Sequence, residues 1–95
     1  MYYLTVDSDA LCAAYMYGTT NPELWGMTAW QAREIMLGCR GLNIIGCDFM
    51  EHNPVKDPSG YATLVSNMMC FELLALLADS REAATGRKNP TTWED

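Results

Sequence analysis

The sequence contains few of the basic residues that nucleic-acid binding requires. Its 95 residues include six lysines and arginines against twelve aspartates and glutamates, which gives a formal net charge of −6. Proteins that bind nucleic acid or an anionic membrane surface concentrate basic residues, so we expect neither partner. Hydrophobic residues make up 49% and charged residues 19% of the chain. This balance is too apolar for a disordered chain and indicates one that folds.

Motifs for several kinds of chemistry are also absent. The four cysteines, Cys12, Cys39, Cys47 and Cys70, form no C-x-x-C pair and have no neighbouring histidine, which argues against a zinc ribbon or a redox motif. The single histidine, His52, cannot complete a Ser/His/Asp or Cys/His arrangement, and no G-x-G-x-x-G or Walker loop occurs. The N-terminus has no basic stretch followed by an apolar one, so we expect a cytoplasmic location.

The first part of the chain has the pattern of a strand, a long loop and a helix. The apolar and β-branched run over 2–6 predicts a buried strand that ends at Asp7. Residues 9–27 show neither the two-residue period of a strand nor the 3.6-residue period of a helix, which predicts a long loop. A helix is expected to begin at Thr28, which stands three residues before Gln31 in a capping-box pattern. Four apolar residues are expected to form its buried face: Ala32, Ile35, Met36 and Cys39.

A second strand and a second helix follow. Residues 43–49 form a nearly continuous apolar run, which is typical of a strand covered on both faces. The helix predicted over 62–78 is apolar nearly all round, but polar residues such as Asn67 and Glu72 interrupt it. We therefore interpret it as a buried helix, not as a membrane span. Residues 80–95 are charged and polar and are expected to form a disordered tail.

This order of elements predicts an α/β fold. Two strands joined by a helix lie parallel because such crossovers are right-handed. Parallel sheets have helices on both faces and usually more than two strands, so the helix over 62–78 needs neighbours that the sequence does not supply. We therefore expect a βαβα piece of a larger, doubly wound parallel sheet.

Carboxylates follow both predicted strands. Asp7 and Asp9 are two residues apart at the carboxyl end of the first strand, where alternation would point both side chains the same way. Two oxygen donors suit Mg, Ca or Mn. Glu51 ends the second strand and is expected at the same edge of the sheet, where the three carboxylates would converge. A metal ion or a guanidinium substrate would neutralise such a cluster.

The residues alone leave other interpretations open. The D-x-D pair also fits a solvated turn or a helix cap, and Glu51 also fits a surface position at a strand end. His52 stands beside Glu51 as a candidate base or ligand, but adjacent residues of an extended chain point to opposite faces. We therefore expect His52 to point away from Glu51 and to be a capping or exposed histidine.

Two longer segments carry recognisable motifs. Residues 3–28 contain YLTVDSDAL and GTTNPELWGMT, similar to a strand that delivers D-x-D into a loop of the type G-T-G-T-P-E-x-x-G-L-T. Residues 34–60 contain GLNIIGCDFMEHNPVKD, similar to G-L-N-V-V-G-x-D-x-V-E-x-N-P-x-x-D. Both patterns resemble the ureohydrolase family of arginases and agmatinases, the agmatinase branch in particular. The resemblance covers residues 2–79.

The resemblance implies an arginase-like fold and a dimanganese hydrolase that converts a guanidino compound such as agmatine to urea and an amine. It matches Asp7 and Asp9 to two metal-binding aspartates, and Glu51 to the glutamate that pairs with the substrate guanidinium. The family's other ligands, a histidine and an aspartate-histidine-aspartate motif, lie on earlier strands without a counterpart here. We therefore expect residues 1–79 to be the C-terminal portion of a ureohydrolase domain, truncated at its N-terminal side and inactive by itself.

A non-catalytic interaction module is the alternative function. The apolar helix over 62–78 and the sheet edge would then be covered by self-association or by a full-length relative. A stand-alone metal-binding domain is a third interpretation. It would use only the three carboxylates and would hold Mg or Mn weakly.

Overall fold

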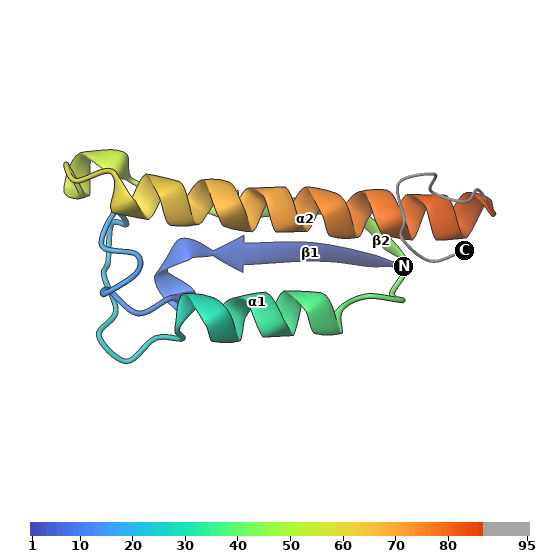
Figure 1. Cartoon of the computed structure of the whole chain (residues 1–95), viewed down its shortest axis with the longest axis horizontal. Helices are drawn as coiled ribbons and strands as arrows, with labels where there is room; N and C mark the ends of the chain where they lie inside the picture. Colours follow the sequence, from blue (N-terminus) through green and yellow to red (C-terminus); the bar gives the residue numbers. More distant parts are fainter. Residues whose placement is uncertain (87–95) are drawn as a thin grey trace.

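Strands and helices alternate along the chain, as the sequence pattern predicts. The computed structural model describes residues 1–86. The elements follow in this order: β1 (Tyr2–Asp7), the 3-10 helix η1 (Ser8–Ala10), α1 (Ala29–Gly38), β2 (Ile44–Met50), the 3-10 helix η2 (Pro54–Lys56) and α2 (Tyr61–Thr85). Figure 1 shows α1 and α2 running alongside the strands, with the long loop before α1 at one end.

β1 and β2 pair as parallel strands, which confirms the predicted α/β class. Tyr2 pairs with Ile44 at one end of the sheet and Asp7 pairs with Met50 at the other. Since the pairing ends at Asp7 and Met50, the segments after both strands begin at the same edge of the sheet. This edge positions the candidate site.

The predicted capping box starts α1. The backbone N–H of Gln31 donates to the Thr28 hydroxyl, and the backbone N–H of Thr28 donates to the Gln31 side chain, each at 3.0 Å. Ala32 and Met36 are buried as expected, whereas Ile35 is 58% exposed. The prediction for Ile35 is wrong because it lies over a hollow beside the free edge of β1, where residues 1–86 supply no further strand.

α2 extends beyond the helix that the sequence pattern predicts. It continues through Ser80 to Thr85 and ends at Gly86, whose φ of 73° is left-handed. The Ser80 hydroxyl accepts from the backbone N–H of Ile44 at 2.7 Å and donates to the carbonyl of Leu42 at 2.9 Å. These bonds fasten the helix to the start of β2, so the expected tail does not begin at residue 80. Residues 87–95 lie outside the described part of the chain.

The hydrophobic core lies between the sheet and the two helices. Ile44 of β2, Met36 of α1 and Leu73 of α2 are all nearly inaccessible to solvent. The opposite face of the sheet is open, and its Tyr3 hydroxyl donates to Asp48 at 3.0 Å. The expectation that β2 is covered on both faces is therefore wrong within residues 1–86, because both helices pack on one side.

Only one side of α2 is buried. Its inner residues face the core, while apolar residues such as Leu64 and Phe71 are exposed on the outer side. The helix is also long and apolar enough to cross a membrane by length and composition, with a mean hydropathy of 1.5 in a window of which 33% is buried. A partly buried core helix meets the same criterion.

Candidate active-site edge

The two predicted aspartates lie where β1 ends, but on different elements. Asp7 is the last residue of the strand and is exposed, and Asp9 is half-buried in η1. The alternation argument therefore does not apply to Asp9, because a 3-10 helix turns the chain by about a third of a revolution per residue. Within residues 1–86 neither carboxylate has a hydrogen-bond partner or an ion pair.

Ser8, between the two aspartates, points into the interior. It is fully buried, and its hydroxyl has no hydrogen-bond partner among the described residues. A buried hydroxyl without a partner lowers stability because it has lost its hydration without compensation. The segment after β1 thus keeps an unsatisfied polar group between its two carboxylates.

Glu51 follows β2 with an unusual backbone. Its φ is 70°, the left-handed region, and among residues 1–86 it is the only residue other than glycine with a positive φ. This conformation costs free energy in a non-glycine residue and persists where the surroundings hold it. The fully buried Thr19 provides that support, since its hydroxyl donates to the Glu51 carbonyl at 2.8 Å. The Glu51 side chain itself is exposed.

The backbone on either side of Thr19 pairs with the segment after Glu51. Thr19 forms an antiparallel bridge with His52, and the N–H of Asn53 donates to the carbonyl of Gly18 at 2.6 Å. Gly18 is required here, because a Cβ at this position would lie 2.7 Å from the Cβ of Ala62 and 3.3 Å from the Asn53 carbonyl oxygen. The loop after β1 therefore holds the turn after β2 in place.

His52 connects this turn to α2. Its Nδ1 lies 3.1 Å from the Ser66 hydroxyl oxygen and its Nε2 lies 3.4 Å from that of Thr63. The ring is half-buried against the helix, so it is neither a free surface histidine nor a helix cap. The prediction of a capping or exposed histidine is wrong because Ser66, buried on the inner side of α2, provides a polar partner.

Asp57 caps the start of α2, a role that the sequence analysis missed. Its carboxylate accepts from the hydroxyl and N–H of Ser59 and from the N–H of Ala62, the last at 2.9 Å. The Ser59 hydroxyl and the Ala62 N–H hold the pKa of Asp57 below its usual range. An aspartate followed by proline, serine and glycine just before an apolar helix is the signal that would have found it.

Thr19 was also missed, for a different reason. Two adjacent threonines in a loop give no sign of which hydroxyl is buried, and the partner of Thr19 is a carbonyl 32 positions away. Only the return of the chain at the end of β2 brings the two groups together. Long-range side-chain bonds of this kind have no local sequence signature.

Comparison with known proteins identifies the family of this chain. A family model described as the arginase family matches residues 1–75. The chain belongs to the arginase family. The resemblance drawn from the D-x-D and G-x-D-x-x-E segments is thereby confirmed, and with it the assignment to this family's fold.

Several arginase-family relatives are similar over most of the chain. Mitochondrial agmatinase from Gallus gallus is 47% identical over 75 residues, which are 79% of this chain and 22% of that protein. Guanidinopropionase from Pseudomonas aeruginosa is 45% identical over 78 residues, or 82% of this chain and 24% of that protein. The chain therefore spans about a quarter of the length of these relatives.

Solved structures superpose on most of the chain. A hypothetical agmatinase from Burkholderia thailandensis superposes with a TM-score of 0.77 at 35% identity, covering 86% of this chain and 26% of that one. A formiminoglutamase from Trypanosoma cruzi, solved with Mn²⁺, superposes with a TM-score of 0.69 at 22% identity, covering 80% of this chain and 26% of that one. That last likeness supports the shared fold.

A manganese pair does not fit the donors of residues 1–86 taken alone. Asp7 and Asp9 are hard oxygen donors of a type that suits manganese. Nowhere in this part of the arginase-family chain, however, do three or more His, Cys, Asp or Glu side chains gather as a metal site requires. The expected convergence of Glu51 with the two aspartates into one cation cluster is therefore not found, although all three lie at the carboxyl ends of the strands.

Proposed function

We propose that this chain supplies one edge of a ureohydrolase active site, at which a guanidino compound such as agmatine is hydrolysed to urea and an amine. The observation that carries the proposal is the anchored Glu51, held by Thr19 in a left-handed turn beside the end of β1. Relatives named agmatinase and guanidinopropionase support a guanidino substrate.

Glu51 is the residue proposed to bind substrate. Its carboxylate is exposed and has no partner among the described residues, so both oxygens are available to a guanidinium group. A carboxylate and a guanidinium meet through two parallel hydrogen bonds, which set the orientation as well as the affinity. Because a left-handed turn fixes the Glu51 backbone, less conformational freedom is lost when the substrate binds.

Asp7 and Asp9 are proposed as ligands that contribute to a manganese site without completing it. Two carboxylates leave most coordination positions of a divalent ion to other groups. We therefore propose that the isolated chain releases no urea and that activity needs the remaining ligands of a complete domain. Bound manganese would serve to activate water for attack on the guanidinium carbon.

A segment exchange tests this function. Residues 1–79 would replace the matching segment of chicken mitochondrial agmatinase, with which they share 47% identity over 75 residues. The chimera is expected to release urea from agmatine or another guanidino compound, whereas the isolated chain with manganese is not. Glu51→Gln in the chimera should lower kcat/KM by about 100-fold, since it removes a charge-assisted bond.

Controls separate binding from folding. Glu34, exposed on α1, provides the matched control, and Glu34→Gln should leave the rate unchanged. Asp7→Asn with Asp9→Asn should abolish manganese binding by the folded chimera in a calorimetric titration. A folded, manganese-loaded chimera that releases no urea, or one that tolerates Glu51→Gln, would contradict the proposal.

A further inference from the structure

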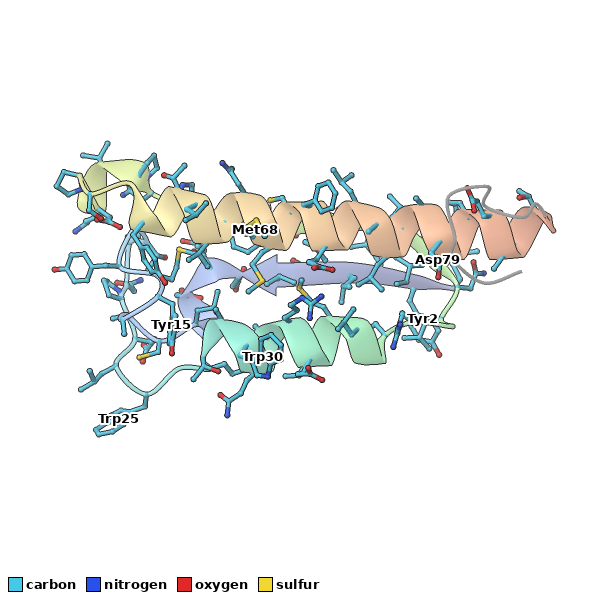
Figure 2. The ribbon with its side chains drawn as sticks, viewed as in Figure 1. Tyr2, Tyr15, Trp25, Trp30, Met68 and Asp79 are labelled. Carbon is cyan, nitrogen blue, oxygen red and sulfur yellow. The ribbon has the colours of Figure 1, made fainter. Side chains whose placement is uncertain are left out.

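His52 belongs to a hydrogen-bonded network that joins three segments of the chain. Its Nδ1 lies 3.1 Å from the Ser66 hydroxyl oxygen, and its Nε2 lies 3.4 Å from that of Thr63. The Ser66 hydroxyl, which is buried, also lies 3.6 Å from the sulfur of the fully buried Met16. Figure 2 shows Tyr15, the neighbour of Met16, at the end of the molecule where α2 begins. The loop after β1, the turn after β2 and α2 therefore meet in this His52 network.

The partners of Ser66 decide which ring nitrogen carries the hydrogen. A serine hydroxyl has one hydrogen, and that of Ser66 donates to the Met16 sulfur, which can only accept. Its oxygen is left as an acceptor, so the Nδ1 of His52 must supply the hydrogen of the bond between them. In the neutral ring, Nε2 then accepts from the Thr63 hydroxyl. The hydrogen-bond network thus assigns the Nδ1–H tautomer.

The peptide group between Glu51 and His52 is restrained on both sides. The Thr19 hydroxyl donates to the Glu51 carbonyl at 2.8 Å, and the His52 ring holds the next residue against α2. A φ of 70° is unfavourable for a glutamate, so its backbone would relax to a commoner conformation if a restraint were lost. The ring therefore helps to set the direction in which the Glu51 side chain leaves the backbone.

A general base fits the same ring less well. A base needs a ring nitrogen within hydrogen-bond reach of the reacting group. Both nitrogens of His52 instead face hydroxyls of α2, at 3.1 and 3.4 Å. Fixed protein partners of this kind are those of a residue that orients its neighbour.

We propose that His52 is a positioning residue for Glu51, and that its ring, with the hydrogen on Nδ1, fastens the substrate-binding turn to α2. The proposal rests on the function proposed above for Glu51 and adds a second anchor to the one at Thr19. A carboxylate with two backbone anchors loses less conformational freedom when it binds a guanidinium group. Loss of the His52 network should therefore weaken substrate binding more than it slows the chemical step.

Nitrogen NMR of the full chain tests the position of the hydrogen. His52 is the only histidine among the 95 residues, so ¹⁵N-histidine labelling reports on this ring alone. In mildly alkaline buffer the spectrum should show a protonated Nδ1 and an unprotonated Nε2. A ring protonated at Nε2, or one that averages between the two forms, would contradict the assignment.

Amide hydrogen exchange of the same chain tests the anchor without any assay of activity. The N–H of Asn53 donates to Gly18 at 2.6 Å and reports on the turn, whereas that of Ile44 donates to Ser80 at 2.7 Å and reports on the start of β2. His52→Leu should speed exchange at Asn53 about tenfold, the equivalent of one hydrogen bond, and leave Ile44 unchanged. His52→Asn should keep exchange slow, because its amide N–H can take the place of Nδ1–H.

Substitutions on α2 test the network from the other side. Ser66→Ala should speed exchange at Asn53 about as much as His52→Leu does, and the double variant should add little because both changes remove the same bond. Thr63→Val should have a smaller effect, since its contact is longer. Asn67→Ala, at an exposed position of the same helix, is the matched control and should change nothing. Circular dichroism confirms that each variant remains folded.

The segment-exchange chimera connects the anchor to substrate binding. His52→Leu should raise KM for the guanidino substrate about tenfold and lower kcat by less than about twofold, since it removes an aid to binding. His52→Asn should restore KM. A general base would behave differently, because neither leucine nor asparagine can replace it and kcat would fall with both.

Three results would overturn the proposal. The first is equal acceleration of exchange at Asn53 and Ile44, which would make His52 a general contributor to stability. The second is unchanged exchange at Asn53 in His52→Leu. The third is a chimera in which both His52 variants lose kcat and keep KM. An unsubstituted chimera without activity would contradict the proposed function instead, while the exchange rates would still decide whether His52 anchors the turn.

Discussion

The segments that follow β1 and β2 differ in the hydrogen bonds that hold their functional residues. After β2, the Glu51 carbonyl, the His52 ring and the Asp57 carboxylate all bond to other segments. After β1, the carboxylates of Asp7 and Asp9 have no partner within residues 1–86. Hydrogen bonds within this chain therefore hold the proposed substrate-binding side in place. On the proposed metal side, residues 1–86 provide no partner for the two carboxylates.

The physical reason is the position of the neighbours. The turn after β2 lies between the returning loop at Thr19 and the first turn of α2, which together offer donors and acceptors on both sides. The end of β1 borders the free edge of the sheet, where residues 1–86 supply no further strand. Preorganisation therefore follows from which neighbours the chain itself supplies.

The largest effect is expected from Gly18→Ala, which breaks the anchor after β2. The new Cβ would lie 2.7 Å from the Ala62 Cβ, and both atoms are fixed to backbone. We expect a loss of about 1–3 kcal/mol in the free energy of unfolding, measured in urea. Gly38→Ala is the control, since nothing lies within 4 Å of its Cβ position, and it should be neutral or slightly stabilising.

Thr19→Val tests the same anchor by removing one hydrogen bond without adding volume. The valine keeps the volume but leaves the Glu51 carbonyl without its donor, so we expect destabilisation by about 1–2 kcal/mol. In the chimera, Thr19→Val releases the Glu51 backbone from this bond and should raise KM more than it lowers kcat. Thr20→Val at the exposed neighbouring position should change neither quantity. An equal effect of both substitutions would mean that Thr19 does not position Glu51.

Ser8→Ala should stabilise the folded chain. The substitution removes a buried hydroxyl that has no partner among the described residues, so the chain should gain about 1 kcal/mol of stability. Ser66→Ala is a matched control of opposite sign, because that buried hydroxyl contacts His52 and Met16 and its loss should destabilise. If thermal unfolding shows both variants below the wild type, Ser8 has a partner.

The smallest effect concerns the acid sensitivity of the Asp57 cap. The Ser59 hydroxyl and the Ala62 N–H lower the pKa of Asp57 in the folded chain, so its ionised form stabilises the fold above the unfolded pKa of about 4. This contribution is lost as the pH falls from there through the folded pKa. Asp57→Asn should therefore flatten the acid side of the melting-temperature profile. Ser59→Ala should give an intermediate profile.

Local patterns predicted local structure well. The capping box at Thr28, the strand end at Asp7 and the second helix were all predicted from neighbouring residues, because caps and periodicity act over a few positions. The prediction failed for Ile35, whose helical position is apolar but faces a hollow. A pattern shows which side of a helix is apolar, not whether another element covers it.

The site was predictable only in part. Asp7, Asp9 and Glu51 lie at the carboxyl ends of the two strands, as the order of elements required, and this follows from the parallel pairing. Their convergence into one cation cluster was not borne out in residues 1–86, since distances between side chains depend on turns rather than on strand order. The anchors at Thr19 and His52 came from contacts distant in sequence.

The sequence by itself therefore determined the elements, their parallel order and the family, since hydrophobic period, capping and motif spacing are properties of short segments. The tertiary structure decided which groups are held and which are free. It brought the Thr19 hydroxyl within hydrogen-bond distance of the Glu51 carbonyl and packed the His52 ring against α2. It also left the apolar residues on one side of that helix exposed. Such outcomes depend on which segments meet in space, because burial and long-range hydrogen bonds are set by packing.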